Sequence, residues 1–325
     1  MIRRLVLGEA GIGVALVLLA GFFMVAAPSF ATEQNLRNIM TQITLNTVLA
    51  VGMTFVILIG GIDLSVGSAM ALCAVVSGTL MAGSASAGTL LLAILLSMAV
   101  GGVVGFVNGF VSEQWRVPSF IVTLAMLNIA RGAAERYTGA ATIYDLPAAL
   151  NDFGTLTLAG IPAVFWVALV LVGLGWFVLS RTVFGRLVYA IGNNEEAVRL
   201  SGHKTSRVKI ACFVIGGFTV GVAALLYMAR LNIASPILGQ GYELNAIAAV
   251  VIGGASLMGG RGSMIGTFLG ACLLGVLTNG LLLMGVDDFS RQIITGFVIL
   301  LAVILDAYRL RLARKLAVTA APVAA

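Results

Sequence analysis

The stretch VILIGGIDLSVGSAMALCAVVSG, residues 56–78, holds two apolar runs that are separated by a glycine pair and by one carboxylate, Asp63. Glycines at such a junction mark the end of one helix, and the apolar run that follows predicts the start of another. An acid between two apolar helices needs polar partners close by. The stretch therefore predicts a bundle of apolar helices that contains one irregular, polar junction.

The composition places this bundle in a membrane. Of the 325 residues, 60% are hydrophobic and only 10% are charged, whereas soluble domains contain about a quarter charged residues. The apolar runs continue for about 17 to 24 residues, which suits transmembrane helices rather than the alternating strands of a barrel. Forty glycines and only six prolines fit helices that approach one another closely through small residues.

Ten transmembrane helices are expected, in a single domain that covers residues 1–325. Their predicted ranges are 10–28, 43–60, 64–83, 88–112, 118–137, 161–180, 210–230, 244–260, 264–284 and 291–306. The first run follows Arg3 and Arg4, but its apolar core of about 19 residues is longer than a signal core of about 7 to 15, so it is interpreted as a retained span. Residues 307–325 are expected to form a flexible cytoplasmic tail.

The basic residues predict the orientation of the chain. If the amino terminus is cytoplasmic, the loops and ends on that side contain 14 of the 19 Lys and Arg residues. These are Arg3, Arg4, Arg116, Arg181, Arg186, Arg199, Lys204, Arg207, Lys209, Arg261, Arg309, Arg311, Arg314 and Lys315. Because basic residues in short loops mark the cytoplasmic side, both termini are predicted to be cytoplasmic. The net charge of +6 then needs no nucleic-acid partner.

The segment RTVFGRLVYAIGNNEEAVRLSGHKTSRVKI, residues 181–210, is a long charged stretch on the predicted inner side. Asn193 or Asn194 can cap a short helix whose first turn carries Glu195 and Glu196, and Gly202 can end it. Its apolar side would consist of Ala197, Val198 and Leu200. The segment is either a solvated charge run or a docking element for a cytoplasmic partner.

Within this segment, EAVRLSG (residues 196–202) resembles the E-A-A-three-residues-G signature of bacterial ABC importer permeases, whose short helix inserts into a cleft on the ATPase subunit. The blocks AVGMTFVILIGGIDLSVGS, VPSFIVTLAMLNIARG, GRLVYAIGNNEEAVRLSG and GYELNAIAAVVIGGASLMGGRGSMIGTFLGACLLGVLTNGL look like those of permeases in ribose, xylose and related monosaccharide importers. The resemblance extends from about Asn35 to Asp306. One departure is Asn245, where the family usually has an aspartate.

The resemblance implies an all-α permease subunit of the bacterial inner membrane that imports a monosaccharide. Its implied partners are a second permease copy or homologue, two cytoplasmic ATPase domains that bind ATP and Mg, and a periplasmic sugar-binding protein. The implied ATPase-coupling residues are Glu195, Glu196, Ala197, Arg199, Leu200, Ser201 and Gly202. Nucleosides or branched-chain amino acids are the alternative cargo, because related permeases carry them.

Asp63 has two interpretations. Its carboxylate can cap a helix that begins near Leu64, or the break at Gly60, Gly61 and Asp63 can open polar groups toward a central pathway. The residues expected to line that pathway are Asp63, Ser65, Asn108, Asn128, Asn245, Ser256 and Asn279. Each could instead join helices through hydrogen bonds. Arg131 is expected either to reach the membrane interface or to pair with Glu135.

Two short echoes suggest an internal repeat. IGGIDL (residues 59–64) recurs as IGGASL (residues 252–257), and NGF at Asn108 recurs as NGL at Asn279. The asparagines are five predicted spans apart, as an inverted repeat requires, whereas the glycine pairs are six spans apart. Gly-rich apolar helices also produce such echoes by chance, so both explanations stay open.

The motifs that would indicate an enzyme are missing from the sequence. It contains no G-x-x-x-x-G-K-[ST] phosphate loop, and the single histidine and three scattered cysteines form neither a metal cluster nor a catalytic set. The chain is therefore expected to bind no cofactor or metal. A second hypothesis is a carrier driven by an ion gradient, but the acids Asp63 and Asp306 are isolated near helix ends rather than paired within spans.

Overall fold

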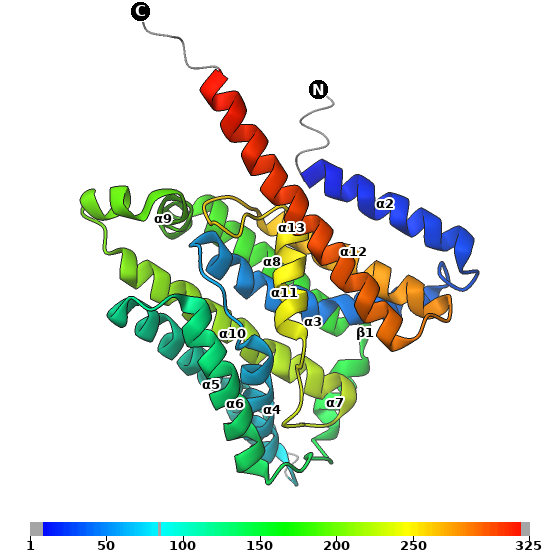
Figure 1. The fold of residues 1–325 in the computed structure, drawn as a ribbon. Helices are drawn as coiled ribbons and strands as arrows, with labels where there is room; N and C mark the ends of the chain where they lie inside the picture. The colour runs from blue at the N-terminus through cyan, green and yellow to red at the C-terminus, as the bar shows by residue number, and fades with distance from the viewer. Residues whose placement is uncertain (1–8, 84–85, 320–325) are drawn as a thin grey trace, which may run out of the picture.

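The computed structural model describes residues 9–83 and 86–319. In the first half of the chain the helices are α2 (Glu9–Ala26), α3 (Glu33–Leu58), α4 (Val66–Met81), α5 (Ala87–Trp115), α6 (Ser119–Thr138) and α7 (Ala148–Thr155). In the second half they are α8 (Ala163–Arg181), α9 (Val183–Leu200), α10 (Thr205–Leu231), α11 (Tyr242–Ile252), α12 (Met264–Leu283) and α13 (Asp288–Thr319). Figure 1 shows α9 at one end of the bundle and α7 at the other.

The structure confirms the predicted helical fold, and its apolar helices are consistent with a membrane protein. Within residues 9–83 and 86–319, five helices are long and apolar enough to cross a bilayer, namely α3, α5, α8, α10 and α12. Three further apolar helices in the same ranges, α2, α4 and α11, are shorter. Strand structure in the described chain is limited to an antiparallel hairpin of β1 (Thr157–Leu158) and β2 (Ile161–Pro162) and to one bridge between Ile143 and Ala234.

The predicted span 244–260 is wrong as one continuous helix. Helix α11 ends at Ile252, and the glycine-rich segment 253–263 that follows is irregular. Gly254, Gly259, Gly260 and Gly262 all have positive φ angles, which an α-helix cannot accommodate. The predicted range also began two residues late, because α11 starts at Tyr242.

The two short helices α4 and α11 begin near the middle of the bundle and run in opposite directions (Figure 1). The irregular segment 59–65 leads from the end of α3 to α4, and the loop 232–241 leads from α10 to α11. At Gly67 and Gly239 the first turn of α4 and this loop approach so closely that a Cβ on either glycine would overlap the other's carbonyl oxygen. Two helix amino termini therefore lie inside the protein.

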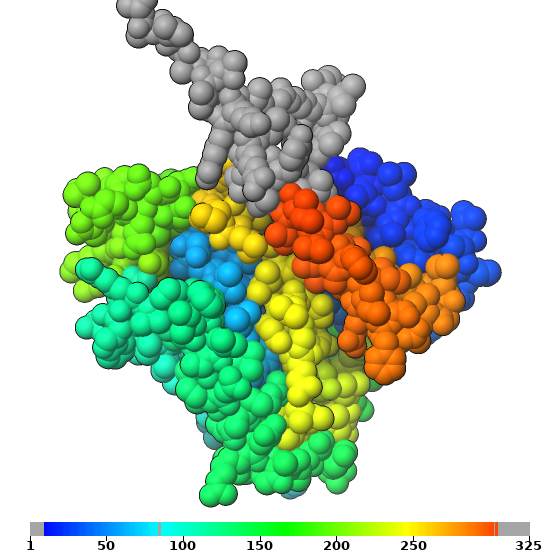
Figure 2. Space-filling model, in the orientation of Figure 1, coloured from blue at the N-terminus to red at the C-terminus, as the bar shows by residue number. Residues whose placement is uncertain are grey.

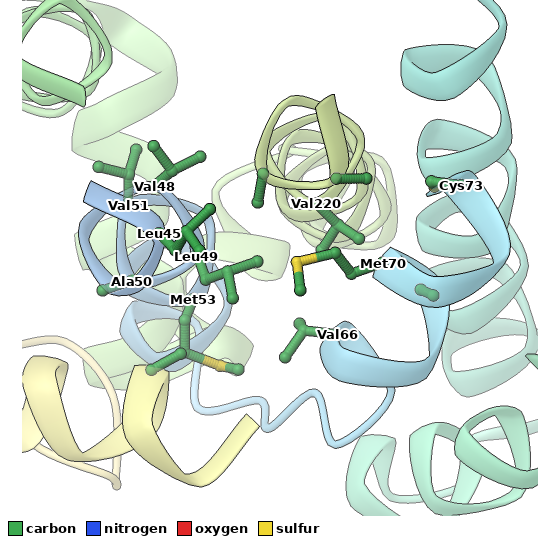
Figure 3. Packing of buried hydrophobic residues seen from close by; sticks show 14 of the residues in the cluster. Leu45, Val48, Leu49, Ala50, Val51, Met53, Val66, Met70, Cys73 and Val220 are labelled. Atoms are coloured by element: carbon green, nitrogen blue, oxygen red, sulfur yellow. The ribbon is translucent and has the colours of Figure 1, made fainter. Parts of the chain in front are cut away.

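Helix α3 lies at the centre of the main hydrophobic core, and 83% of its most apolar window is buried. Figure 3 shows Leu49 and Met53 of α3 facing Val66 and Met70 of α4, with Val220 of α10 beside them. Figure 2 shows the loop 232–241 and α11 as a strip at the surface between α6 and α13. Helix α4 is thus mostly buried, whereas α11 keeps one side at the surface.

Helices α5 and α10 form the most extensive helix pair. Gly101 and Gly105 on α5 approach the backbone of α10 so closely that an added Cβ would overlap the carbonyl oxygens of Gly217 and Phe213. Gly109 approaches Ile210 in the same way, with 2.9 Å between an added Cβ and its Cα. Small residues at every fourth position allow this backbone contact, which is how helices associate strongly in lipid. The two helices therefore pack backbone against backbone from Gly101 to Gly109.

Helices α3–α6 and α10–α13 repeat one pattern of contacts. α5 packs on α10 as α12 packs on α3, and α4 packs on α10 as α11 packs on α3. The pairs α4 with α5 and α4 with α6 likewise match α11 with α12 and α11 with α13. Each of these contacts in one set of four helices thus has a counterpart in the other set.

We predict that Gly105→Ala destabilises the protein by about 1–3 kcal/mol, because the new methyl group must push α5 away from α10. The matched control is Gly132→Ala on α6, where an added Cβ meets nothing within 4 Å. Thermal unfolding in detergent measures both variants. A midpoint for Gly105→Ala equal to that of Gly132→Ala would contradict the close packing.

Candidate functional site

The polar junction after α3 is organised around Asp63. Its Oδ1 accepts a hydrogen bond from the backbone N–H of Ser65 at 2.8 Å and one from the Ser65 hydroxyl at 2.6 Å. The side-chain amide of Asn108 on α5 donates to Ser65 Oγ at 2.9 Å. All three side chains are buried, and Asp63 is only 4% exposed. We call Asp63, Ser65 and Asn108 the junction network.

Helix α6 supports the junction from the other side. The hydroxyl of Ser119 accepts a hydrogen bond from the backbone N–H of Ile62 at 3.0 Å, and that of Thr123 accepts from the N–H of Leu64 at 3.1 Å. Irregular backbone at membrane depth is tolerated where protein satisfies its polar groups, and these two hydroxyls do so. The junction is therefore held by side chains from α5 and α6 rather than left as a loose loop.

The expected cap at Asp63 has a different geometry from that predicted. Helix α4 begins at Val66, with Ser65 as its N-cap residue, and not near Leu64. The Asp63 carboxylate accepts hydrogen bonds from Ser65 itself and so forms a turn before the helix rather than capping its first turn. It still fixes where α4 starts, because it orients the residue that precedes the helix.

The other predicted pathway residues are dispersed. Asn279 on α12 exchanges two side-chain hydrogen bonds with Asn35 on α3, at 3.0 and 3.1 Å, and so joins two helices. Asn128 is exposed on α6 and donates to the carbonyl of Leu124. Ser256 is buried in the glycine-rich segment, and Asn245 is half-buried near the start of α11. The structure thus brings together Asp63, Ser65 and Asn108, and places these four elsewhere.

Arg131 has a role that neither sequence interpretation included. Its guanidinium donates to the backbone carbonyls of Pro236 and Leu238, at 2.5 and 2.8 Å. These carbonyls belong to the loop 232–241, whose Gly239 contacts the start of α4. Arg131 therefore ties α6 to the second irregular segment, as Ser119 and Thr123 on the same helix tie α6 to the first.

The short helix predicted within residues 181–210 is present as the second part of α9. Asn194 has non-helical angles, φ −161° and ψ 91°, and its side chain accepts a hydrogen bond from the N–H of Ala197 at 3.0 Å. Asn194 is therefore the capping residue, and Gly202, with φ +86°, follows the helix end. We call residues 195–200 the short helix. Residues 183–193 before it are also helical, which the sequence analysis did not predict.

Most of the short helix faces outward. Glu196, Ala197 and Arg199 are exposed and Leu200 is 75% exposed, so the predicted apolar side is limited to the buried Val198. Arg199 and Glu196 form an ion pair at 2.6 Å. The hydrogen bond from Arg199 lowers the pKa of Glu196 below its ordinary value, so this acid is charged at neutral pH.

The short helix is seated on the bundle by a backbone junction. A Cβ on Gly192 would overlap the carbonyl oxygen of Leu58 at the end of α3 and the N–H nitrogen of Gly260. The N–H of Gly260 donates to that same Leu58 carbonyl at 2.8 Å, and Asn193 donates to the Gly260 carbonyl at 3.1 Å. We call Leu58, Gly192, Asn193 and Gly260 the glycine junction. It joins α3, α9 and the glycine-rich segment.

A cleft of about 660 Å³ opens beside the short helix. Its lining comes from the end of α3, the α5–α6 connection, the short helix and the start of α10, and includes Gly61, Glu113, Arg116, Glu195, Ser119 and Lys209. Lys209 pairs with Glu113 at 2.5 Å and with Glu195 at 3.1 Å. Acidic and basic side chains balance in this lining, which gives the cleft a polar but nearly neutral surface.

The side chains that could bind a metal ion lie apart from one another in the residues that the structure describes. Over those residues, no group of three or more His, Cys, Asp or Glu side chains lies close enough to hold an ion. Cys73, Cys212 and Cys272 are unpaired thiols on three different helices. The side chains that the structure brings together in the candidate site offer hydrogen bonding and charge pairing.

We predict that Asp63→Leu destabilises the protein by about 1–3 kcal/mol, because it leaves the buried N–H and hydroxyl of Ser65 without their acceptor. Asp63→Asn keeps an acceptor oxygen of the same size and is the matched control. Unfolding midpoints in detergent distinguish the two. Equal midpoints for the Leu and Asn variants would remove the structural role of the carboxylate.

The family model and the similar proteins all describe transport permeases. Residues 35–303 match the family described as branched-chain amino acid transport system / permease component. The chain is 40% identical to the ribose import permease protein of Escherichia coli strain K12, over 90% of this chain and 92% of that protein. It is 40% identical to the ribose import permease protein of Bacillus subtilis strain 168, over 93% of each chain. It is 36% identical to the fructose import permease protein of Rhizobium meliloti, over 89% of this chain and 82% of that one.

No solved structure matches the chain. The family match covers the polar junction, the short helix and the glycine-rich segment together, and the relatives align over nearly their whole length. The chain therefore belongs to the family of permease components of the branched-chain amino acid transport system type, which includes import permeases for sugars.

Proposed function

We propose that this protein is the membrane permease subunit of an ATP-driven, binding-protein-dependent importer, and that it moves a monosaccharide across the bacterial inner membrane by alternating access. The observation that carries this proposal is the near full-length identity of 40% to ribose import permeases. The chain itself is not an enzyme. ATP and Mg are bound by separate ATPase subunits, because the sequence has no phosphate-binding loop of its own.

The proposed topology has ten crossings with both termini in the cytoplasm. A bilayer core of about 30 Å requires about 20 helical residues, but α4 has 16 residues and α11 has 11. Each crosses together with irregular backbone, namely segment 59–65 for α4 and loop 232–241 with the glycine-rich segment for α11. Arg116 follows α5, whereas Arg199 and Lys209 belong to α9 and α10, yet all three line one cleft, which supports the α9 end of the bundle as the cytoplasmic end.

The contact pattern supports an inverted repeat of α3–α6 and α10–α13. The short helices α4 and α11 occupy corresponding places in the two sets, and they run in opposite directions from the middle of the bundle (Figure 1). Transporters built from inverted repeats place broken helices at the midplane, where the solute binds. The proposed path therefore passes the amino termini of α4 and α11.

The junction network is the best supported part of this path, since its hydrogen-bonding groups suit a neutral polyhydroxylated solute. Asp63, Ser65 and Asn108 lie together at the start of α4, and Asn108 Oδ1 is buried with no hydrogen-bond partner. Asn245 lies near the start of α11, the corresponding place in the other half. Asn128, Ser256 and Asn279 remain proposed path residues with weaker support, because they lie apart from this network.

The short helix is proposed to couple the permease to its ATPase. Its residues Glu195, Glu196, Ala197, Arg199 and Leu200, with Ser201 and Gly202, project at the proposed cytoplasmic end, and most are exposed. An exposed Leu200 beside a compact ion pair is suited to insertion into a cleft on a partner. The assembly would contain two permease copies or a homologous pair, two ATPase domains and a periplasmic binding protein.

Two alternatives compete with this function. The family description names branched-chain amino acids, and nucleosides are a further possible cargo. An amino acid would need partners for both its carboxylate and its ammonium group, whereas the junction network offers one acid and neutral groups. An ion-driven carrier is less well supported, because Asp63 hydrogen-bonds to serine rather than to a second acid.

Transport by purified protein in liposomes, with its companion ATPase and binding protein, tests the proposal. We expect ATP-dependent uptake of a labelled monosaccharide that excess leucine or uridine does not reduce. ATP-dependent uptake of leucine or uridine instead would favour the alternative cargo. Uptake by this chain alone under a pH gradient, without ATP, would favour the ion-driven carrier.

We predict that Leu200→Asp lowers capture of the ATPase subunit and solute uptake at least tenfold, because it puts a charge into a desolvated contact. Thermal stability should stay unchanged, because this side chain is 75% exposed. Leu156→Asp is the matched control, since it changes an exposed leucine at the opposite end of the bundle, beside β1. Normal capture and uptake by Leu200→Asp would contradict the docking role.

A further inference from the structure

The short helix has two attachments of different kinds. On one side the glycine junction holds its preceding turn against the end of α3 by backbone contacts that leave no room for a side chain. On the other side it is held by side chains, namely the ion pair of Glu195 with Lys209 at 3.1 Å and the buried Val198. Between the two attachments lies Asn194, where the helix axis is broken. The first attachment is rigid, and the second can be released without disturbing backbone packing.

Lys209 does more than pair with Glu195. Its ammonium group also pairs with Glu113 on α5 at 2.5 Å, and the Glu113 side chain is only 12% exposed. Three donors on one ammonium group allow it to serve both carboxylates at once. Lys209 therefore links the short helix to α5 as well as to α10, the helix that carries it.

The link continues into the junction network. Helices α5 and α10 are locked together by backbone contacts at Gly101, Gly105 and Gly109. Glu113 and Asn108 both lie on α5, and Asn108 donates to Ser65 at the start of α4. A displacement of the short helix that is transmitted through Lys209 would therefore move α5 and α10 as one body and shift the hydrogen bond at the junction.

We propose that Lys209 is a positioning residue of the transport cycle, which transmits movement of the short helix to the α5–α10 pair through its ion pairs with Glu195 and Glu113. This proposal rests on the proposed function, because it assumes an ATPase that moves the short helix. The glycine junction is then the pivot, and the cleft beside the short helix changes shape as the short helix moves together with the α5–α10 pair.

The experiment compares Lys209→Met, Lys209→Arg and Glu195→Gln in liposomes that contain the companion ATPase and binding protein. Solute uptake and ATP hydrolysis are measured together, and the readout is the number of ATP molecules hydrolysed per solute transported. Lys209→Met should keep ATPase capture and ATP hydrolysis within about twofold of wild type but lower uptake at least tenfold, so that more ATP is consumed per solute. Lys209→Arg should largely restore the ratio, because the guanidinium keeps both charge pairs.

Glu195→Gln provides a second variant if Lys209→Met fails to fold, because it leaves the more buried Lys209–Glu113 pair intact. It should also raise the ATP consumed per solute. The control is Arg37→Met, which breaks the ion pair with Glu33 at the start of α3, far along the chain from the cleft. A wild-type ratio in Glu195→Gln, or in a folded Lys209→Met, overturns the role of Lys209.

The two levels of the proposal fail in different ways. Wild-type protein that captures no ATPase and takes up solute without ATP would overturn the proposed function, and the role of Lys209 with it. A different result overturns only the role of Lys209. In that case wild-type protein captures the ATPase and takes up solute with ATP, and Lys209→Met and Glu195→Gln consume the same amount of ATP per solute as wild type. An equal rise in ATP consumed per solute in Lys209→Met and Lys209→Arg also contradicts the role of Lys209. Arginine keeps the positive charge, so the ion pairs would then not be what transmits the movement.

Discussion

The position of the short helix on the bundle depends on Gly192, because there is no room for a side chain at this residue. The carbonyl oxygen of Leu58 and the N–H of Gly260 occupy the space that a Cβ would need, so three segments from distant parts of the sequence meet backbone to backbone. This contact fixes where α3 ends, where the glycine-rich segment turns, and where α9 emerges. The short helix has a defined position on the bundle because of it.

A second constraint comes from the membrane. Irregular backbone inside a bilayer must find its hydrogen bonds within the protein, and the two irregular segments before α4 and α11 do so through α6. Ser119 and Thr123 serve the first segment and Arg131 serves the second. One helix thus supports both breaks, which lets the amino termini of two short helices lie in the middle of the bundle without a loose loop. A permease needs such polar groups in its interior if it is to carry a polar solute.

Sequence reasoning found the features that depend on neighbouring residues. A cap at Asn193 or Asn194 and the end at Gly202 followed from local helix chemistry, and the structure selects Asn194. Asp63 was expected to cap the next helix, and it instead accepts hydrogen bonds from Ser65, two residues on. Features that depend on distant residues were missed. The pairing of Lys209 with Glu113, the contacts of Arg131 and the reciprocal bonds of Asn279 with Asn35 join segments about 100 to 250 residues apart, and no local pattern indicates such partners. The early end of α11 was an avoidable error, because four glycines between residues 253 and 260 already argue against a helix.

The short helix is proposed to face the cytoplasm and to meet an ATPase there. The most direct test replaces Cys73, Cys212 and Cys272 with serine, introduces Ser201→Cys, and labels vesicles with a membrane-impermeant maleimide. We expect labelling in inverted vesicles and not in right-side-out ones, and protection from labelling when the companion ATPase is added. Labelling from the outer side, or labelling that the ATPase does not change, would contradict it.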